Sequence, residues 1–121
     1  MNLLVVEDDQ AAQFALSALL DDLGAKVVLA DSGEDALRMV LKHEFAAILL
    51  DVRLPGMDGH EVAAAIRSLE RTRRTPIIFM SANEDRRRRP RPAAHGEDYL
   101  RKPLAPEVVR SKVQALLPVD A

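Results

Sequence analysis

Short and nearly continuous apolar runs constrain the fold of this 121-residue chain more than any other feature. Strands that do not alternate between apolar and polar residues are covered on both faces, as in a parallel sheet between helices. The runs therefore predict an α/β fold with a parallel sheet. They are Leu3–Val6, Lys26–Ala30, Ala46–Leu50 and Pro76–Met80, with a weaker run at Asp98–Leu100.

The segments between these runs have helical spacing and helix-end signals. Ser32 can cap one helix, Asp58 with Glu61 resembles a capping box, and Pro106 suits a first helical turn. Right-handed crossovers in a short chain favour a flavodoxin-like, doubly wound sheet of five strands in the order 2-1-3-4-5, with helices on both faces. The expected apolar faces are Ala12, Leu16, Leu19 and Leu23; Ala36, Leu37, Val40 and Leu41; Val62, Ala65, Ile66 and Leu69; and Val109, Val113 and Leu116.

The arginine-rich tract Arg86–Arg91 breaks this pattern where a fourth helix is expected. Pro90 and Pro92 would each cost about 3 kcal/mol inside a helix, because proline removes a donor and clashes with the preceding turn. We expect a short turn near Asn83–Arg88 followed by irregular chain.

Composition indicates one domain, residues 1–121, because 48% hydrophobic content at this length can bury a core. The N-terminal apolar run is too short for a signal peptide or a membrane span. We expect a cytoplasmic domain without membrane contact. The absence of cysteine excludes disulfides and thiolate chemistry, and a formal charge of −2 gives no general argument for a nucleic-acid partner.

Acidic residues follow two of the apolar runs. Asp51 ends the third run, and Glu7, Asp8 and Asp9 follow the first. Neighbouring parallel strands would bring these acids to one edge of the sheet, where open α/β sheets bind ligands. Clustered carboxylates repel one another unless a cation or a shared proton is present. The sequence therefore predicts a divalent metal site beside a nucleophilic or ligating aspartate, with Asp9 capping the first helix instead.

Ser81 and Lys102 follow the fourth and fifth runs, so that a hydroxyl and a cation join the acids. With these parts the chain resembles a bacterial response-regulator receiver domain over essentially its whole length. The resemblance depends on Val5–Asp8, Asp51–Gly59, Met80–Ala82 and Asp98–Pro103.

The resemblance implies a phosphoacceptor and not an enzyme that turns over free substrates. Asp51 would attack the phosphohistidine of a histidine kinase or histidine phosphotransfer protein, giving an aspartyl phosphate. Asp8, Asp51 and the Arg53 backbone carbonyl would ligate Mg²⁺, or alternatively Mn²⁺, with Glu7 as a ligand through water. Lys102 would pair with Asp51 and then with the phosphoryl group.

The resemblance also implies a switch and a cis peptide bond between Lys102 and Pro103. Ser81 would bond a phosphoryl oxygen, and its movement would let Tyr99 swing from an exposed to a buried position. The domain would thereby change the surface that it offers to a downstream effector or a fused domain.

Other interpretations remain open. A receiver-fold interaction module would signal without phosphorylation. An aspartyl phosphatase typically carries a second aspartate two residues after the nucleophile, where this chain has Arg53. The arginine tract invites a nucleic-acid role, but it lacks interleaved aromatic residues. The block Arg67–Ile78 is similar to receivers of hybrid sensor kinases, and the sequence does not choose between these and a stand-alone regulator.

Overall fold

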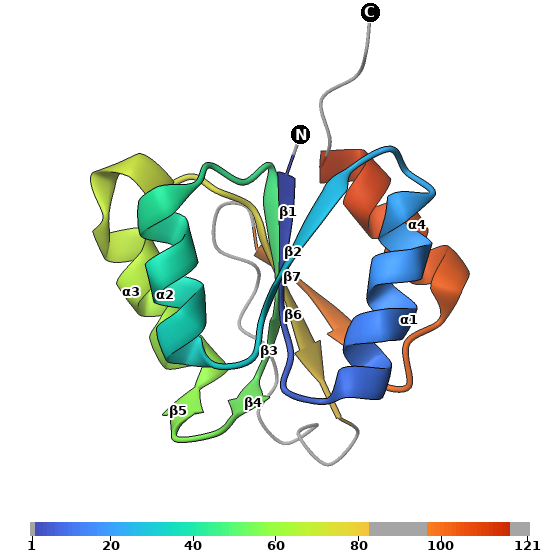
Figure 1. Cartoon of the computed structure of the whole chain (residues 1–121), viewed down its shortest axis with the longest axis horizontal. Helices are drawn as coiled ribbons and strands as arrows, with labels where there is room; N and C mark the ends of the chain where they lie inside the picture. Colours follow the sequence, from blue (N-terminus) through green and yellow to red (C-terminus); the bar gives the residue numbers. More distant parts are fainter. Residues whose placement is uncertain (1, 83–96, 117–121) are drawn as a thin grey trace, which may run out of the picture.

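The computed structural model describes residues 2–82 and 97–116, and its centre is a five-stranded parallel sheet (Figure 1). The strand order β2-β1-β3-β6-β7 confirms the predicted 2-1-3-4-5 arrangement, because β6 and β7 are the fourth and fifth strands of this sheet. The strands are β1 (Asn2–Val6), β2 (Lys26–Ala30), β3 (Ala47–Asp51), β6 (Ile77–Ser81) and β7 (Glu97–Arg101).

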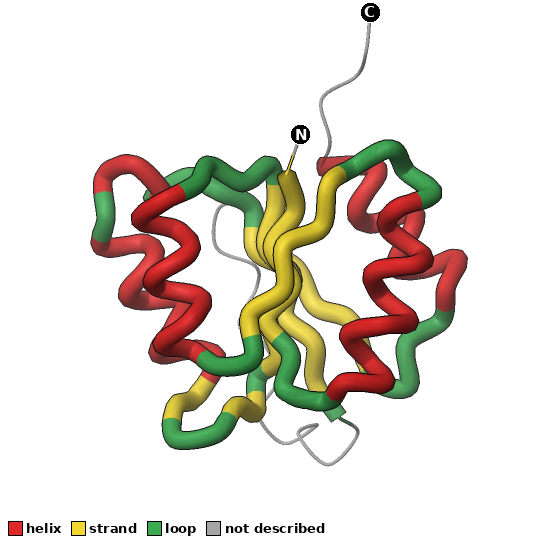
Figure 2. Tube along the Cα trace, viewed as in Figure 1, coloured by secondary structure: helices red, strands yellow, loops and turns green. Residues whose placement is uncertain are grey.

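Helices cover both faces of the sheet (Figure 2). Helices α1 (Gln10–Asp21) and α4 (Pro106–Leu116) lie on one side, and α2 (Gly33–Lys42) and α3 (Gly59–Ser68) lie on the other. A short 3₁₀ helix, η1 (Glu70–Thr72), follows α3. The sheet therefore separates two hydrophobic clusters, and alternate residues of each central strand serve one cluster or the other.

Local sequence signals set the helix starts as predicted. The Asp9 carboxylate accepts a hydrogen bond from the Ala12 N–H at the start of α1, and Ser32 accepts from Asp35 at the start of α2. Asp58 and Glu61 form a reciprocal capping box on α3. These caps satisfy backbone donors that a helix cannot satisfy itself.

The buried helix faces differ in part from the expected ones. On α1 the buried residues are Gln13, Leu16 and Leu20, whereas Leu19 is only partly buried. Leu41 on α2 is 61% exposed. Val40 occupies the buried face of α2, and the next residue points about 100° further round the helix, which carries Leu41 away from the core.

A small antiparallel hairpin follows β3 and was not predicted. It consists of β4 (Arg53–Leu54) and β5 (Met57–Asp58), and Gly56 between them has a φ of 70°. That backbone conformation favours glycine, which has no Cβ to clash.

The expected short or irregular fourth helix lies outside the described residues. Among the helices of residues 2–82 and 97–116, none combines the length and apolarity that crossing a membrane requires.

Candidate functional site

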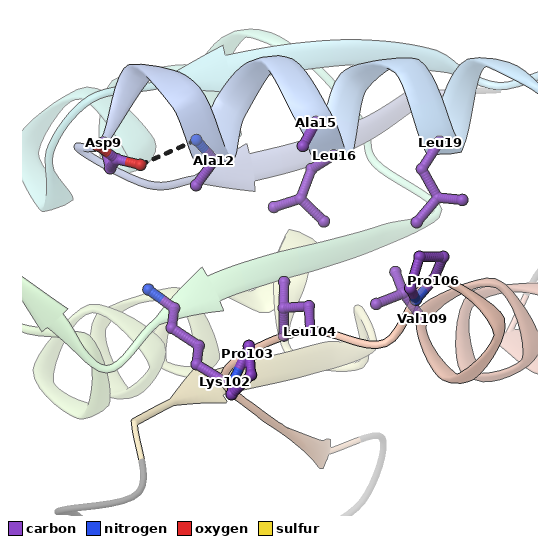
Figure 3. Close-up of a pocket in the computed structure, with 10 residues that line it drawn as sticks. All are labelled: Asp9, Ala12, Ala15, Leu16, Leu19, Lys102, Pro103, Leu104, Pro106 and Val109. Carbon is purple, nitrogen blue, oxygen red and sulfur yellow. Dashed lines mark hydrogen bonds between the residues drawn. The ribbon is translucent and has the colours of Figure 1, made fainter.

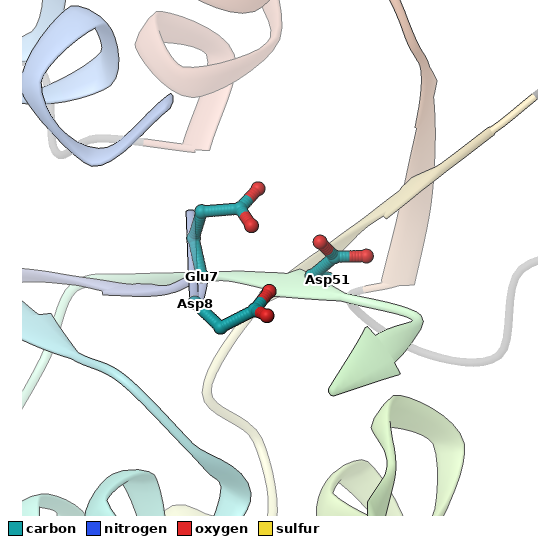
Figure 4. Close-up of side chains that lie close together, drawn as sticks. All are labelled: Glu7, Asp8 and Asp51. Atoms are coloured by element: carbon teal, nitrogen blue, oxygen red, sulfur yellow. The ribbon is translucent and has the colours of Figure 1, made fainter. Parts of the chain in front are cut away.

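Three carboxylates gather at the carboxyl ends of β1 and β3, as the sequence predicted. Glu7 and Asp8 directly follow β1, Asp51 is the last residue of β3, and the two strands are neighbours in the sheet. Ligand oxygens from the three side chains lie within 4.8 Å of one another. Figure 4 shows the three side chains directed into the same space.

The cluster lies at the boundary between the core and solvent. Glu7 is 1% exposed and Asp51 is 5% exposed, whereas Asp8 is exposed. The cluster therefore offers solvent one exposed acid, Asp8, in front of two buried ones. Oxygen atoms from several carboxylates form a donor set that suits a hard cation such as Mg²⁺.

Lys102 supplies a cation to the two buried acids. Its Nζ donates to Asp51 Oδ2 at 2.7 Å and to Glu7 Oε1 at 3.0 Å, and its side chain is 30% exposed. The bond to Asp51 was expected, but the bond to Glu7 was not. The peptide bond between Lys102 and Pro103 is cis, in agreement with the resemblance, and the Lys102 N–H donates to the Ser81 carbonyl at 2.7 Å.

Burial and charge shift two pKa values in the site. Burial raises the pKa of Glu7, and the Asp51 charge adds to this, while hydrogen bonds from Lys102 and the Asp9 N–H oppose it. Burial alone would lower the pKa of Lys102, but its hydrogen bonds to Asp51 and Glu7 and their negative charges raise it overall. Lys102 is therefore held as an ammonium, and the Glu7 carboxylate would gain from a further cation.

The backbone after β3 fixes the second oxygen of Asp51. The Arg53 N–H donates to Asp51 Oδ1 at 3.0 Å, so both carboxylate oxygens have donors. Gly59 also lies close, because a Cβ at this position would clash with the Asp51 carbonyl oxygen. Its N–H donates to the Val52 carbonyl at 2.7 Å. Only glycine fits this approach between the start of α3 and the strand end.

Ser81 and Tyr99 lie on the two strands beyond β3. Ser81 is the half-buried last residue of β6, in the strand next to that of Asp51. Tyr99 is half-buried on β7 and stacks on Phe79, with ring centroids 5.0 Å apart and planes 25° apart. The structure thus places Ser81 at the same edge of the sheet as Asp51, and Tyr99 within β7.

Gln13 belongs to the site but was missed in the sequence. Gln13 is 8% exposed, and its side-chain amide donates to the Glu7 carbonyl and, at 2.6 Å, to Asp31 Oδ1. Gln13 thereby joins α1 to the ends of β1 and β2. A sequence signal was available, because Gln13 lies three positions before Leu16 and therefore on the same, apolar face of the helix. A polar residue on a buried face needs a hydrogen-bond partner.

An apolar groove of about 390 Å³ adjoins the acidic cluster between α1 and α4. Figure 3 shows the α1 side chains facing those of the segment after β7. Asp9 and Lys102 lie at the end of the groove nearest the acids, and Leu16, Leu19 and Val109 give it an apolar lining. The site therefore combines a charged centre with an apolar flank.

Comparison with known proteins finds relatives that match most of the chain. Residues 3–114 match the family described as the response regulator receiver domain. The chain is 38% identical to the transcriptional regulatory protein AfsQ1 of Streptomyces coelicolor over 96% of its own length and 51% of that protein. It is 35% identical to the sensor histidine kinase GacS of Pseudomonas protegens over 84% of its own length and 12% of that protein. The chain thus spans only part of both relatives.

A solved structure supports the family from the fold. The receiver domain of sensor histidine kinase PA1611 from Pseudomonas aeruginosa has a TM-score of 0.83, with 34% identity and 95% of both chains covered. That structure is described as having a magnesium ion coordinated in its active-site cleft. Since the family match covers nearly all of the chain and the acids converge at the sheet edge, the chain belongs to the response regulator receiver domains of two-component phosphorelays.

Proposed function

We propose that Asp51 is the residue of this receiver domain that accepts the phosphoryl group. The observation that carries the proposal is the position of Asp51, which is 5% exposed at the end of β3 and whose carboxylate lies 2.7 Å from the Lys102 ammonium. An Asp51 oxygen attacks phosphorus on a phosphohistidine, an oxygen–phosphorus bond forms, and the phosphorus–nitrogen bond breaks. The electron pair of the broken phosphorus–nitrogen bond stays on the imidazole nitrogen of the donor.

Positioning and charge neutralisation are what phosphoryl transfer needs most from a protein. The Arg53 N–H and the Lys102 ammonium orient the two Asp51 oxygens. When phosphorus bonds to one Asp51 oxygen, the Lys102 ammonium can pair with the negative charge of the phosphoryl group instead. The Ser81 hydroxyl, at the end of the neighbouring strand, is proposed to bond another phosphoryl oxygen.

The acids that surround Asp51 fit a magnesium site. Asp8, Asp51 and the Arg53 carbonyl would hold Mg²⁺ directly, with Glu7 acting through water, and Mn²⁺ is an alternative. The supporting observation is the convergence of the three carboxylates, whose ligand oxygens lie within 4.8 Å of one another. The bound ion would neutralise charge on the phosphoryl oxygens during transfer.

The donor is proposed to be a histidine kinase or a histidine phosphotransfer protein. The exposed Asp8 and the apolar groove beside Lys102 offer such a protein a surface next to Asp51. The output is proposed to be a change in the position of Tyr99, which an effector or a fused domain reads. Phosphorylation would shift an existing equilibrium by its differential affinity for the two states.

A direct test uses acetyl phosphate as the donor, followed by intact-mass measurement. With Mg²⁺ the wild type should gain one phosphoryl group, and with excess EDTA it should gain none. Asp51→Asn should gain none under either condition, while Asp58→Asn, which alters the cap of α3, should still be phosphorylated. An unmodified wild type, or a phosphorylated Asp51→Asn protein, would refute the assignment.

Neither competing function has a specific observation in its favour. The hydrogen bonds from Lys102 to both Asp51 and Glu7 support phosphorylation over a purely structural interaction module. Arg53 at the general-acid position argues against an aspartyl phosphatase. A single domain over residues 1–121 and a cytoplasmic location stay predictions, as does the absence of nucleic-acid and membrane partners.

A further inference from the structure

The rings of His60, Phe79 and Tyr99 form a cluster on the side of the sheet that α3 covers. The centroid of the His60 imidazole lies 4.7 Å from that of Phe79 and 6.5 Å from that of Tyr99, and the Phe79 and Tyr99 centroids are 5.0 Å apart. All three separations fall in the range of direct aromatic contact.

The cluster joins the sheet to a helix. Phe79 is 1% exposed and is the cross-strand neighbour of Tyr99, so the strands alone bring these two rings together. His60 comes from the first turn of α3 and keeps 43% of its side chain exposed. It therefore covers the Phe79 ring from outside the sheet, at the point where Tyr99 also packs.

His60 is connected to the segment that follows Asp51. The Asp58 carboxylate accepts the His60 backbone N–H at 2.8 Å and lies 3.2 Å from its Nδ1. The preceding residue, Gly59, packs directly against the Asp51 carbonyl and donates to the Val52 carbonyl. A displacement of the backbone at Asp51 would therefore be passed to the His60 ring through one residue.

We propose that His60 is a positioning residue for Tyr99. Its ring completes the contact surface on Phe79, holds the Tyr99 ring in its half-buried position, and connects that position to the backbone at Asp51. The proposal depends on the proposed role of Tyr99 as the element that moves. It adds a second route from Asp51 to Tyr99, through the start of α3, beside the route through Ser81.

The composition of the chain allows a direct optical test. Tyr99 is the only tyrosine and tryptophan is absent, so tyrosine emission reports on Tyr99 alone. His60→Leu should raise the acrylamide quenching constant of the unphosphorylated protein about twofold, because the released ring samples exposed positions. His60→Phe keeps a ring at this place and should restore the wild-type value. Equal quenching in the wild type and His60→Leu would overturn the proposal.

A matched control is His43→Leu. His43 also pairs with an aromatic ring, that of Phe45 at 6.1 Å, but it caps the end of α2. This variant should leave Tyr99 quenching at the wild-type value. A rise equal to that of His60→Leu would mean that loss of any ring contact loosens the domain, and it would refute a specific role for His60.

A second measurement needs no variant. Nuclear Overhauser effects in the wild type should connect His60 ring protons with those of Phe79, and those of Phe79 with those of Tyr99. Their absence in a folded, dispersed spectrum would contradict the cluster even if His60→Leu failed to fold.

Phosphorylation separates this proposal from the proposed function. Acetyl phosphate with Mg²⁺ should change Tyr99 quenching in the wild type, and His60→Leu should show less than about half of that change. An undiminished change in His60→Leu would remove His60 from the route. If Asp51 accepts no phosphoryl group, the proposed function fails, whereas the comparison in unphosphorylated protein still decides whether His60 positions Tyr99.

Discussion

Replacing Lys102 with methionine tests the ion pairs at the centre of the site. The Lys102 ammonium bonds Glu7 Oε1 at 3.0 Å and Asp51 Oδ2 at 2.7 Å, and these two acids are 1% and 5% exposed. Methionine keeps much of the length of lysine but has no charge. Lys102→Met therefore leaves two buried carboxylates facing one another without their cation, and the folded state should lose stability.

The expected loss can be worked out from burial. Removing one partner of a fully buried ion pair costs about 3–5 kcal/mol. Because Lys102 is 30% exposed, solvent already screens part of the interaction, and we expect about 2–3 kcal/mol in the absence of divalent metal. For a domain of this size the urea midpoint should fall by about 1–2 M.

The assay is urea unfolding in EDTA, followed by circular dichroism, with Lys112→Met as the control. Lys112 bonds Asp98 at 2.8 Å, but the two side chains are 33% and 49% exposed. Such a pair should contribute less than about 1 kcal/mol. Adding Mg²⁺ should recover part of the stability lost by Lys102→Met, because a ligand that binds the folded state stabilises it. Equal losses in the two variants would refute the reasoning.

Three other substitutions test contacts that link the strands of the sheet to neighbouring helices. Gly59→Ala forces a Cβ against the Asp51 carbonyl and should cost about 1–3 kcal/mol, with slower phosphorylation by acetyl phosphate. Gln13→Leu leaves the Glu7 carbonyl without its amide donor and should cost about 1–3 kcal/mol in thermal unfolding. Burial alone would raise the pKa of Asp98, but hydrogen bonds from Lys112 and from the Tyr99 N–H lower it overall. The ionised Asp98 therefore stabilises the fold fully above the ordinary aspartate pKa, and this stabilisation is lost as pH falls through the pKa of the folded state. Asp98→Asn should accordingly be less stable than the wild type at neutral pH and equally stable in acid.

Controls separate these effects from general damage. Gly24 has a φ of 76°, and a Cβ at this position would lie within 4 Å of no atom of the described residues beyond its chain neighbours. Gly24→Ala should therefore cost about 1–2 kcal/mol through backbone strain alone, without slowing phosphorylation. Gln114 is exposed on α4, and Gln114→Leu should change stability by less than about 0.5 kcal/mol. Gly59→Ala with a normal phosphorylation rate, Gln13→Leu with full stability, or an Asp98→Asn deficit that persists in acid would each contradict its prediction.

The order of residues along the chain was enough to predict the sheet, its strand order and the acidic cluster. Continuous apolar runs identify strands that are covered on both faces, and the ends of parallel strands necessarily meet at one edge. That is why Glu7, Asp8 and Asp51 could be brought together from their positions in the chain. Helix caps such as Asp9 and Ser32 were equally accessible, because a cap acts on a backbone group within three residues.

Contacts between side chains from distant elements became visible only in the folded molecule. The second bond of Lys102, to Glu7, spans from the residue after β7 to the residue after β1, although β3 and β6 lie between these strands in the sheet. The Gln13 contacts and the close approach of Gly59 likewise depend on the placement of a helix over the sheet to within a fraction of an ångström. The contacts of His60 with Phe79 and Tyr99 could not be predicted either, because nothing in the sequence around His60 indicates these two rings. Periodicity records which face of an element is buried, but distances between elements are set by packing, and packing is a property of the whole fold.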